Sequence, residues 1–356
     1  MSDNLSEVIE LTPALHDRYE RFVGSQPSAL IYYSLPFRDF LCQTVGGEPR
    51  YLIALSGDEI SGVLPMFVRR DRQFGAVVNS LPWYGSHGGC LLSSDNHAEI
   101  RGQLLSRYLE IVAEEDASFA TLIPSPDESQ RTAQYAAQLS SLTTDVRISQ
   151  ITRLPDAAAD LDQRLAATCR QKTRNLVRKS LKQGFEWFND DSDESWQFLY
   201  DTHVENLTAI GGRAKPHGHF EAMRATIPPD LRQLITVSHR GVRAAALLLF
   251  RFNTTVEYVT PVIKNDYRSL QPLSFAIWHA MRLAAQDGFR QWNWGGTWTT
   301  QHSLRHFKAG WGAEERTYTY FIHAAPAARA QFEADSSRLT AAFPYYYLFP
   351  YRSEAK

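Results

Sequence analysis

The spacing of apolar residues along the chain predicts alternating strands and helices. Apolar residues at every second position, or in short runs, indicate strands, and apolar residues three and four positions apart indicate helices. In the first part of the chain these patterns predict strands at 6–11, 51–55, 60–68, 75–81 and 119–123, and helices at 13–23, 35–45 and 97–114.

The second part of the chain repeats a similar order. Three strand patterns at 234–240, 242–252 and 255–263 follow one another with tight connections and predict a three-strand meander. Further strands are expected at 149–154, 185–188, 291–294 and 317–323, and helices at 161–183, 194–208, 220–226 and 273–286. The polar stretch at 125–150 is typical of a boundary, so we predict two α/β units, at residues 1–148 and 149–356.

The composition is that of a globular protein, with 44% hydrophobic and 21% charged residues in 356. The longest apolar run, AAALLLF at 244–250, is far too short to cross a bilayer. The N-terminus is acidic and shows no secretory signal, and the three cysteines lie far apart without metal-ligand spacing. We therefore expect a reduced, cytoplasmic protein without a transmembrane segment, as a monomer or homodimer.

Charge is distributed unevenly along the chain. Residues 1–150 hold eleven Arg, no Lys and nineteen acidic residues, whereas the remainder holds 26 basic and 20 acidic residues. Residues 164–183, RLAATCRQKTRNLVRKSLKQ, contain seven basic residues and no acidic one. Arg170, Arg174, Arg178 and Lys182 lie four positions apart and would share one helix face. This pattern favours a phosphate-bearing ligand, and the alternative is a solvated charged face.

Two loops combine glycine with polar and aromatic residues. PWYGSHGG at 82–89 contains Tyr84 and His87, and GGRAKPHGHF at 211–220 contains Arg213 and two histidines. Glycine lets a ligand approach the backbone closely, and His87 could serve as a general base or only as a hydrogen-bonding residue. The histidines have no acidic or cysteine partner at ligand spacing, so we predict no metal site.

Four motifs of the second part occur in a specific order. They are the basic helix, the meander, YRSLQPLSFAIWHAMRLAAQDGF at 267–289, and WNWGG at 292–296 followed by LRHFKAGWG at 304–312. In this order they resemble the FemABX-type transferases, relatives of the peptidoglycan aminoacyltransferases within the GNAT fold. The resemblance implies an α/β fold of tandem GNAT-like domains, each a mixed, mostly antiparallel sheet flanked by helices. It also implies transfer of an acyl group to an amine.

The resemblance assigns roles to individual residues. Phe307 and Lys308 fall on the family's Phe-Lys pair, which lies near the carbonyl of the acyl donor. Arg174, Asn175 and Arg178 fall on the basic helix motif, which the family associates with phosphate-bearing acceptors. The other residues that we assign to substrate binding are Lys172, Tyr84, His87, Arg213, Tyr258, Arg268, Trp294, Gly295 and Thr297.

The expected chemistry is attack of an amine on an ester or thioester carbonyl. A fixed cation beside the carbonyl oxygen stabilises the oxyanion that develops, and Lys308 has the required charge. The glycines beside Lys308 are expected to leave room for the substrate. If this segment is extended, His306 points away from the site. Asp266 and His87 remain candidates for the base, and the reaction could also proceed without a dedicated one.

Two departures from the family pattern affect this prediction. Asn293 occupies the position in WNWGG where relatives often carry an acidic residue. The turn RSLQP at 268–272 replaces the glycine-containing loop that holds the CoA pyrophosphate in ordinary GNAT enzymes. We therefore expect no tightly bound cofactor, and either aminoacyl-tRNA or acyl-CoA as the donor.

The leading hypothesis is an N-acyl or aminoacyl transferase that acts on an amino group of a phosphate-bearing precursor. Such a precursor could belong to cell-wall or surface-polysaccharide synthesis, or be an amino sugar or a small metabolite, and charged tRNA is a possible partner. The alternatives are an acyl-CoA-dependent N-acetyltransferase and a non-catalytic binding protein with the same fold. The aromatic tail FPYYYLFPY at 343–351 suits either an interface or docking on its own domain.

Overall fold

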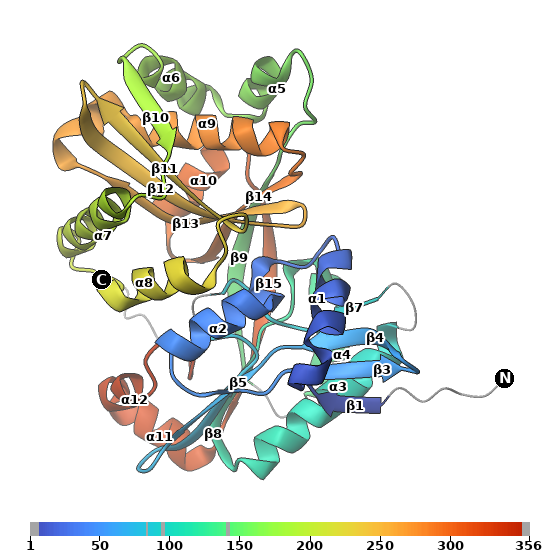
Figure 1. Cartoon of the computed structure of the whole chain (residues 1–356). Helices are drawn as coiled ribbons and strands as arrows, with labels where there is room; N and C mark the ends of the chain where they lie inside the picture. The colour runs from blue at the N-terminus through green and yellow to red at the C-terminus, as the bar shows by residue number, and fades with distance from the viewer. Residues whose placement is uncertain (1–6, 83–84, 94–96, 140–142, 351–356) are drawn as a thin grey trace. The chain divides into compact units, whose positions relative to one another are not determined.

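The computed structural model describes residues 7–82, 85–93, 97–139 and 143–350, and the chain divides into two compact units (Figure 1). Unit 1 comprises Met1–Arg147 and Arg316–Lys356, and unit 2 comprises Ile148–Glu315. The first boundary lies next to the one expected at residue 148. Residues 316–356 differ from the expected division, because they cluster with the first part of the chain.

Unit 1 contains two sheets and the helices that cover them. Its four-stranded sheet has the order β1-β3-β4-β7, and a further run of strands has the order β15-β8-β6-β5-β2. The strands are β1 Glu7–Glu10, β2 Glu48–Pro49, β3 Leu52–Ser56, β4 Glu59–Leu64, β5 Phe67–Asp71, β6 Gly75–Asn79, β7 Leu91–Leu92, β8 Ala117–Leu122 and β15 Glu314–Ala324. The helices are η1 Pro13–Leu15, α1 His16–Ser25, η2 Ile31–Tyr33, α2 Leu35–Thr44, α3 His97–Glu114, η3 Pro126–Arg131, α4 Thr132–Gln138, α11 Pro326–Ala334 and α12 Ser336–Ala342.

The core of unit 1 forms where α3 covers β3, β4 and β8. Ile100, Leu104 and Tyr108 recur every fourth residue on α3 and are buried in this cluster. The strand expected at 60–68 is instead two strands, β4 and β5, which belong to different sheets. Pro65 lies between them, and proline cannot donate to a strand ladder.

Unit 2 is built on strands in the order β10-β11-β12-β13-β14-β9. The predicted meander is confirmed as β11, β12 and β13, and β14 then pairs with β13 in parallel. The strands are β9 Thr143–Arg153, β10 Phe185–Asn189, β11 Arg232–His239, β12 Val242–Phe252, β13 Thr255–Ile263 and β14 Gln291–Trp298. The helices are α5 Leu161–Thr168, α6 Gln171–Ser180, α7 Asp193–Thr208, α8 His217–Thr226, η4 Asn265–Leu270, α9 Pro272–Gln286 and α10 His302–Gly310.

The core of unit 2 lies between its sheet and the helices α5, α6 and α9 (Figure 1). Leu165, Val177 and Met281 bring these three helices into one cluster with the tryptophans of β14. Helix α7 contacts β11, β12 and β13. The mixed, mostly antiparallel sheets flanked by helices confirm the predicted fold class.

The basic segment is two helices rather than the single helix expected at 161–183. The backbone is extended at Cys169 and Arg170, which separates α5 from α6. This break lets the Arg170 N–H donate to the Gly310 carbonyl at 2.8 Å, so a tertiary contact overrides the helical pattern. The charged face is therefore shorter than predicted, because Arg170 precedes α6 and Lys182 follows it.

Lys308 lies on a helix, whereas we expected an extended segment. Residues 302–310 form α10, and the C-terminal turn of this helix carries the lysine. The exposed His306 belongs to the same helix, and it lies about 200° around the axis from Lys308. The reason given for His306 was therefore wrong, because an extended chain places residues two apart on the same face, and it is the helix that turns His306 away from Lys308.

The aromatic tail packs within unit 1. Phe343, Tyr346, Leu348 and Phe349 are buried, and the Tyr346 hydroxyl donates to the Gly46 carbonyl at 2.5 Å. Of the two roles considered for this tail, the structure shows docking, but on the amino-terminal part of the chain and not within the predicted domain 149–356. Over the part of the chain that the structure describes, no helix combines the length and apolar character needed to cross a membrane.

Candidate active site around Lys308

The Lys308 ammonium is buried at the end of β14. The residue is 4% exposed, and its Nζ donates to Thr297 Oγ1 at 2.7 Å and to the Gly295 carbonyl at 3.3 Å. No carboxylate lies within ion-pair distance among the described residues. Burial lowers the pKa of Lys308 to about 8, because the charged form loses solvation that neutral partners do not fully replace.

The partners of Lys308 are fixed by the sequence of β14. Thr297 is fully buried and its hydroxyl donates to Gln150 Oε1 at 3.1 Å, which leaves its lone pairs for the ammonium. Gly295 has a φ of 73°, a region that glycine adopts without strain. A Cβ at Gly295 would meet no described atom within 4 Å, so this side of the strand is open. An ammonium has three N–H groups, and the third is available to a ligand.

The buried carboxylate of Glu257 is connected through Asn293 to Gly295, the glycine whose carbonyl accepts from Lys308. Asn293 Oδ1 accepts the Gly295 N–H at 2.9 Å, and Asn293 Nδ2 donates to Glu257 Oε1 at 3.1 Å. Glu257 and Asn293 are register partners on the parallel strands β13 and β14, and each is 2% exposed. The acidic residue missing from WNWGG therefore has a counterpart one strand away, which sequence analysis missed. Its signal was a glutamate in the middle of an apolar strand, and only the strand register connects it with Asn293.

The parallel pairing of β13 and β14 is short. The register joins Thr255–Glu257 to Gln291–Asn293, and Gly295, Thr297 and Lys308 come after the last of these pairs. The structure therefore brings together Lys308, Gly295 and Thr297 just beyond the paired part of β13 and β14. Gly295 and Thr297 are two of the residues that we assigned to substrate binding.

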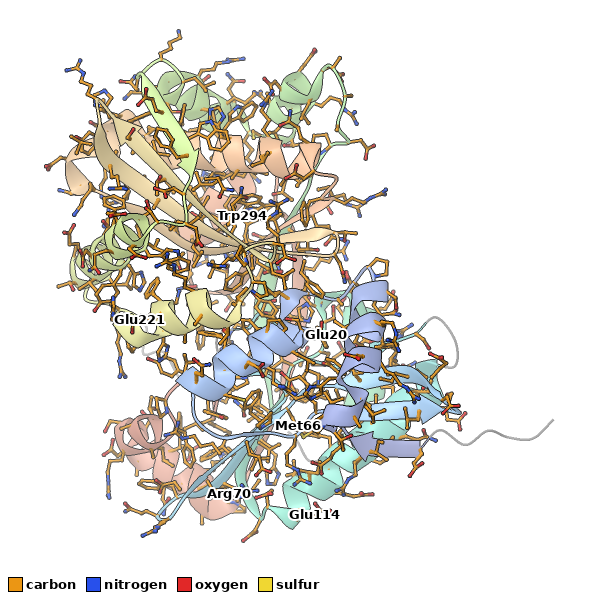
Figure 2. All side chains as sticks on the ribbon, viewed as in Figure 1. Glu20, Met66, Arg70, Glu114, Glu221 and Trp294 are labelled. Atoms are coloured by element: carbon orange, nitrogen blue, oxygen red, sulfur yellow. The ribbon has the colours of Figure 1, made fainter. Side chains whose placement is uncertain are left out.

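The aromatic candidates form the wall of this region. Trp294 is 3% exposed, its indole N–H donates to Thr152 Oγ1 at 2.9 Å, and its ring lies 4.8 Å from that of Tyr258. Phe307 contacts the Trp294 ring edge-on at 5.9 Å and is 37% exposed. Figure 2 marks Trp294 on the sheet of unit 2. Trp292, Trp294 and Tyr258 support the site from the core. Phe307 is the aromatic residue that a ligand could reach.

Most basic candidates lie elsewhere on the surface of unit 2. Arg174 Nη1 donates to the Cys169 carbonyl at 2.6 Å, so this guanidinium caps the end of α5. Asn175 accepts from Gln171 Nε2 at 3.0 Å. Four further basic candidates are exposed, and their charged groups make no hydrogen bond or ion pair with another described residue: Lys172, Arg178, Arg213 and Arg268. The α6 surface is connected to the η4 turn by Lys179, whose Nζ donates to the Ser269 carbonyl at 2.8 Å.

The glycines after Lys308 do not make room for a substrate, contrary to our expectation. A Cβ on Gly310 would lie 2.5 Å from Thr173 Oγ1, and one on Gly312 would lie 2.5 Å from the Thr168 carbonyl oxygen. Both glycines let α10 pack closely against the junction of α5 and α6. Their role is therefore to hold the helix that carries Lys308.

The loop candidates divide between the units. His87 belongs to unit 1, is 6% exposed, and burial lowers its pKa to about 4. Tyr84 lies outside the described residues. Asp266, a candidate base, is exposed in η4. In the described ranges no three His, Cys, Asp or Glu residues converge as they would around a metal ion.

Comparison with known proteins assigns the fold. Residues 167–315 match the family model described as an acetyltransferase (GNAT) domain. The solved structure of FemX is similar with a TM-score of 0.75 and 14% identity, covering 93% of this chain and 100% of that one. A search of curated proteins gives no significant match.

Two further solved structures have similar folds. One is the C-terminal domain of a protein described as a lysylphosphatidylglycerol synthetase from Agrobacterium fabrum, with a TM-score of 0.57 and 14% identity over 90% of this chain and 95% of that one. The other is a tandem GNAT protein from the clavulanic acid biosynthesis pathway, with a TM-score of 0.53 and 12% identity over 89% and 98% of the two chains. The expected likeness in fold to FemX and to tandem GNAT proteins is thereby confirmed, and residues 167–315 match a GNAT acetyltransferase domain model.

Proposed function

We propose that this protein transfers an acyl or aminoacyl group to an amino group of a phosphate-bearing acceptor, with Lys308 as the residue that faces the donor carbonyl. The observation that carries the proposal is the buried Lys308 ammonium, which lacks a carboxylate partner within the described residues and keeps one N–H free. Such a cation, fixed before the reaction, stabilises a developing oxyanion without rearrangement in the transition state.

The hydrogen bonds around Lys308 supply the orientation that this mechanism needs. Thr297 and the Gly295 carbonyl hold two of the three ammonium hydrogens, so the third has a defined direction. The amine attacks the carbonyl carbon, the carbonyl oxygen becomes negative next to Lys308, and the leaving group departs as the oxyanion collapses. The acceptor ammonium first loses one proton to solvent to become the attacking amine, and a second proton passes from the attacking nitrogen to the leaving group.

The donor that we favour is aminoacyl-tRNA, with acyl-CoA as the alternative. The turn before α9 has no glycine, and its Gln271 adopts a φ of 66° directly before Pro272. The exposed cations of α6 and Arg268 suit contacts with the phosphates of a nucleic-acid backbone. The missing glycine loop argues against acyl-CoA, and the exposed cations favour a nucleic-acid donor.

The experiment offers the two donors separately. Purified protein is incubated with a pool of amine acceptors, including nucleotide-linked amino sugars and peptidoglycan precursors. Either tRNA charged with mixed amino acids or a mixture of acyl-CoA thioesters is added, and mass spectrometry identifies any acylated acceptor. We expect product from wild type and a loss of at least a hundredfold for Lys308→Met, which is the size of effect seen when one oxyanion donor is removed. Lys264→Met, which removes a surface lysine bonded to Glu205, is the matched control.

A pH profile of the same reaction tests the role of the charge. Because the ammonium is the active form, its contribution is lost as the pH rises through about 8. Lys308→Arg keeps a cation that stays protonated, so the descending limb should disappear even if the rate is lower. Full activity of Lys308→Met would remove Lys308 from the mechanism. Ligand binding without turnover by wild type would favour the non-catalytic alternative.

A further inference from the structure

A second lysine of unit 2 is held inside a polar cluster. Lys215 follows α7, and its Nζ donates to Thr260 Oγ1 on β13 at 2.9 Å. Its backbone N–H donates to Nε2 of His203 on α7 at 3.1 Å. The loop between α7 and α8 is thus attached at two points, and the ammonium lies against the sheet.

The contact with His203 defines which ring nitrogen carries the proton. A backbone N–H can only donate, so Nε2 must be the acceptor and the neutral ring is protonated on Nδ1. Burial and the nearby Lys215 ammonium, in that order, lower the pKa of His203 to about 4, so this tautomer persists at neutral pH. No described residue accepts from Nδ1, so this N–H is a free donor of the cluster.

No acidic side chain balances this charge among the residues that the structure describes. On α7, Glu205 pairs with Lys264 at 2.7 Å, and Asp201 accepts from Gln197 at 2.8 Å. On α8, Glu221 is exposed and contacts His217 at 3.5 Å, and Figure 2 labels it on this helix. Burial lowers the pKa of Lys215 to about 8.

Unused hydrogen-bonding capacity points to a ligand. Two of the three Nζ hydrogens of Lys215 have no partner in the described parts of the chain. Thr202, next to His203, is fully buried, and its Oγ1 lacks a described partner. Polar groups withdrawn from solvent are almost always paired in folded proteins, and the half-buried Lys215 ammonium has no counter-charge among the described residues.

We propose that Lys215, His203 and Thr260 form a binding site for one carboxylate group, which belongs to the acceptor substrate. The ammonium supplies a single positive charge and the imidazole is neutral, so a carboxylate balances the site whereas a doubly charged phosphate does not. The two free Nζ hydrogens can donate to its two oxygens, and the Nδ1–H of His203 is a further free donor of the cluster. The site itself follows from these contacts, and only the origin of the carboxylate rests on the proposed function.

The test measures anion binding without any transfer reaction. Wild-type protein is treated with an amine-specific acylating reagent at pH 7 in acetate, phosphate or chloride at equal ionic strength, and peptide mass spectrometry gives the labelling rate of each lysine. A paired carboxylate raises the pKa of an ammonium by about one unit or more. Labelling of Lys215 should therefore slow about tenfold at saturating acetate, since one pKa unit changes the free-amine fraction tenfold. Lys264 should be unaffected.

Variants separate a ligand site from a structural contact. Lys215→Met removes the buried charge but keeps much of the apolar stem, so its Tm in chloride should equal or exceed that of wild type. Acetate should raise the Tm of wild type more than that of this variant. Thr260→Val, which keeps the side-chain shape, should weaken the acetate effect at Lys215.

Several outcomes would overturn the inference. Equal slowing of Lys215 and Lys264 would show general salt effects, and stronger protection by phosphate would assign the site to phosphate. A marked loss of Tm for Lys215→Met in chloride would make Lys215 a structural contact. Acetate protection by a protein without transferase activity would leave this site in place and reject only the proposed function.

Discussion

Asn293 makes one hydrogen bond as a donor and one as an acceptor, which an ionised aspartate could not do. Its Nδ2 donates to Glu257 and its Oδ1 accepts the Gly295 N–H. The Gly295 carbonyl then accepts from Lys308. Asparagine at this position is therefore matched to the carboxylate on the neighbouring strand, and it sets the peptide that holds the catalytic candidate.

Asn293→Asp tests this match. The variant places two carboxylates about 3 Å apart, and we expect a loss of unfolding free energy of about 1–3 kcal/mol or more, because a buried donor is removed. The loss should shrink at low pH, since a protonated carboxyl can donate again. Urea unfolding at several pH values measures it.

The double variant Asn293→Asp with Glu257→Gln is the control. Its glutamine can donate to the new aspartate, whose second oxygen still accepts from Gly295, so stability and Lys308 reactivity should recover. A double variant no better than Asn293→Asp would contradict the reciprocal pairing.

Single residues of the site were predicted unevenly from sequence. Lys308, Thr297 and Gly295 were named, because the family motif and the strand WNWGG mark them directly. Glu257 was not named, since its relation to Asn293 depends on the register of β13 and β14, two strands separated by a whole helix. Arg174 was assigned to phosphate binding. The charge pattern of the segment could not reveal that its guanidinium donates to the Cys169 carbonyl.

At the level of elements, the contact between α10 and α6 positions Lys308. Gly310 ends α10, and the absence of a side chain there lets Thr173 of α6 approach. The Arg170 N–H then reaches the Gly310 carbonyl. The break between α5 and α6 and the placement of α10 are thus one packing arrangement.

Gly310→Ala should disturb this arrangement. The new Cβ would lie 2.5 Å from Thr173 Oγ1, and we expect about 1–3 kcal/mol of destabilisation from overpacking. Thermal unfolding measures the loss of stability, and the rate at which an amine-specific reagent labels Lys308 measures any displacement of this lysine. Adding Thr173→Ala removes the obstructing hydroxyl and should restore most of the loss.

Gly218→Ala is the matched control for this prediction. Gly218 lies in α8, and its Cβ would meet only Glu221 at 3.9 Å among the described residues. Alanine should be neutral or stabilising there, because it favours the helix. Equal losses at Gly310 and Gly218 would contradict the packing argument.

Strand and helix positions followed the hydrophobic pattern well where the pattern was regular, as in β11, β12, β13 and α9. They failed where tertiary contacts decide. The segment at 302–310 has no side-chain cap at Gln301 and no acidic residue in its first turn, so little in its sequence indicates a helix. Its helical form is stabilised by packing on α6 and by the hydrogen bonds of Lys308 to Gly295 and Thr297 of β14.

For the whole molecule, buried neutral histidines predict a loss of stability in mild acid. Burial lowers the pKa of His87 and His203 to about 4, and lowers those of His219 and His279. Below about pH 6.5 the unfolded chain binds protons that the folded chain does not, so stability falls as the pH falls.

Between pH 7 and 5 we expect a loss of about 3 kcal/mol, which lowers Tm by about 5–10 °C. Differential scanning calorimetry at both pH values measures the change. His87→Gln should flatten the dependence, because it removes one titrating group. An unchanged Tm between pH 7 and 5 would contradict the prediction.

The discontinuity of unit 1 has a consequence for synthesis on the ribosome. Phe321 belongs to the core of the first unit, and so does the tail with Phe343, yet both are translated after unit 2 is complete. Unit 2 can finish folding once Glu315 has emerged. The amino-terminal unit must wait for residues up to Phe349, which is buried in it, so the part that is made first reaches its native core after unit 2.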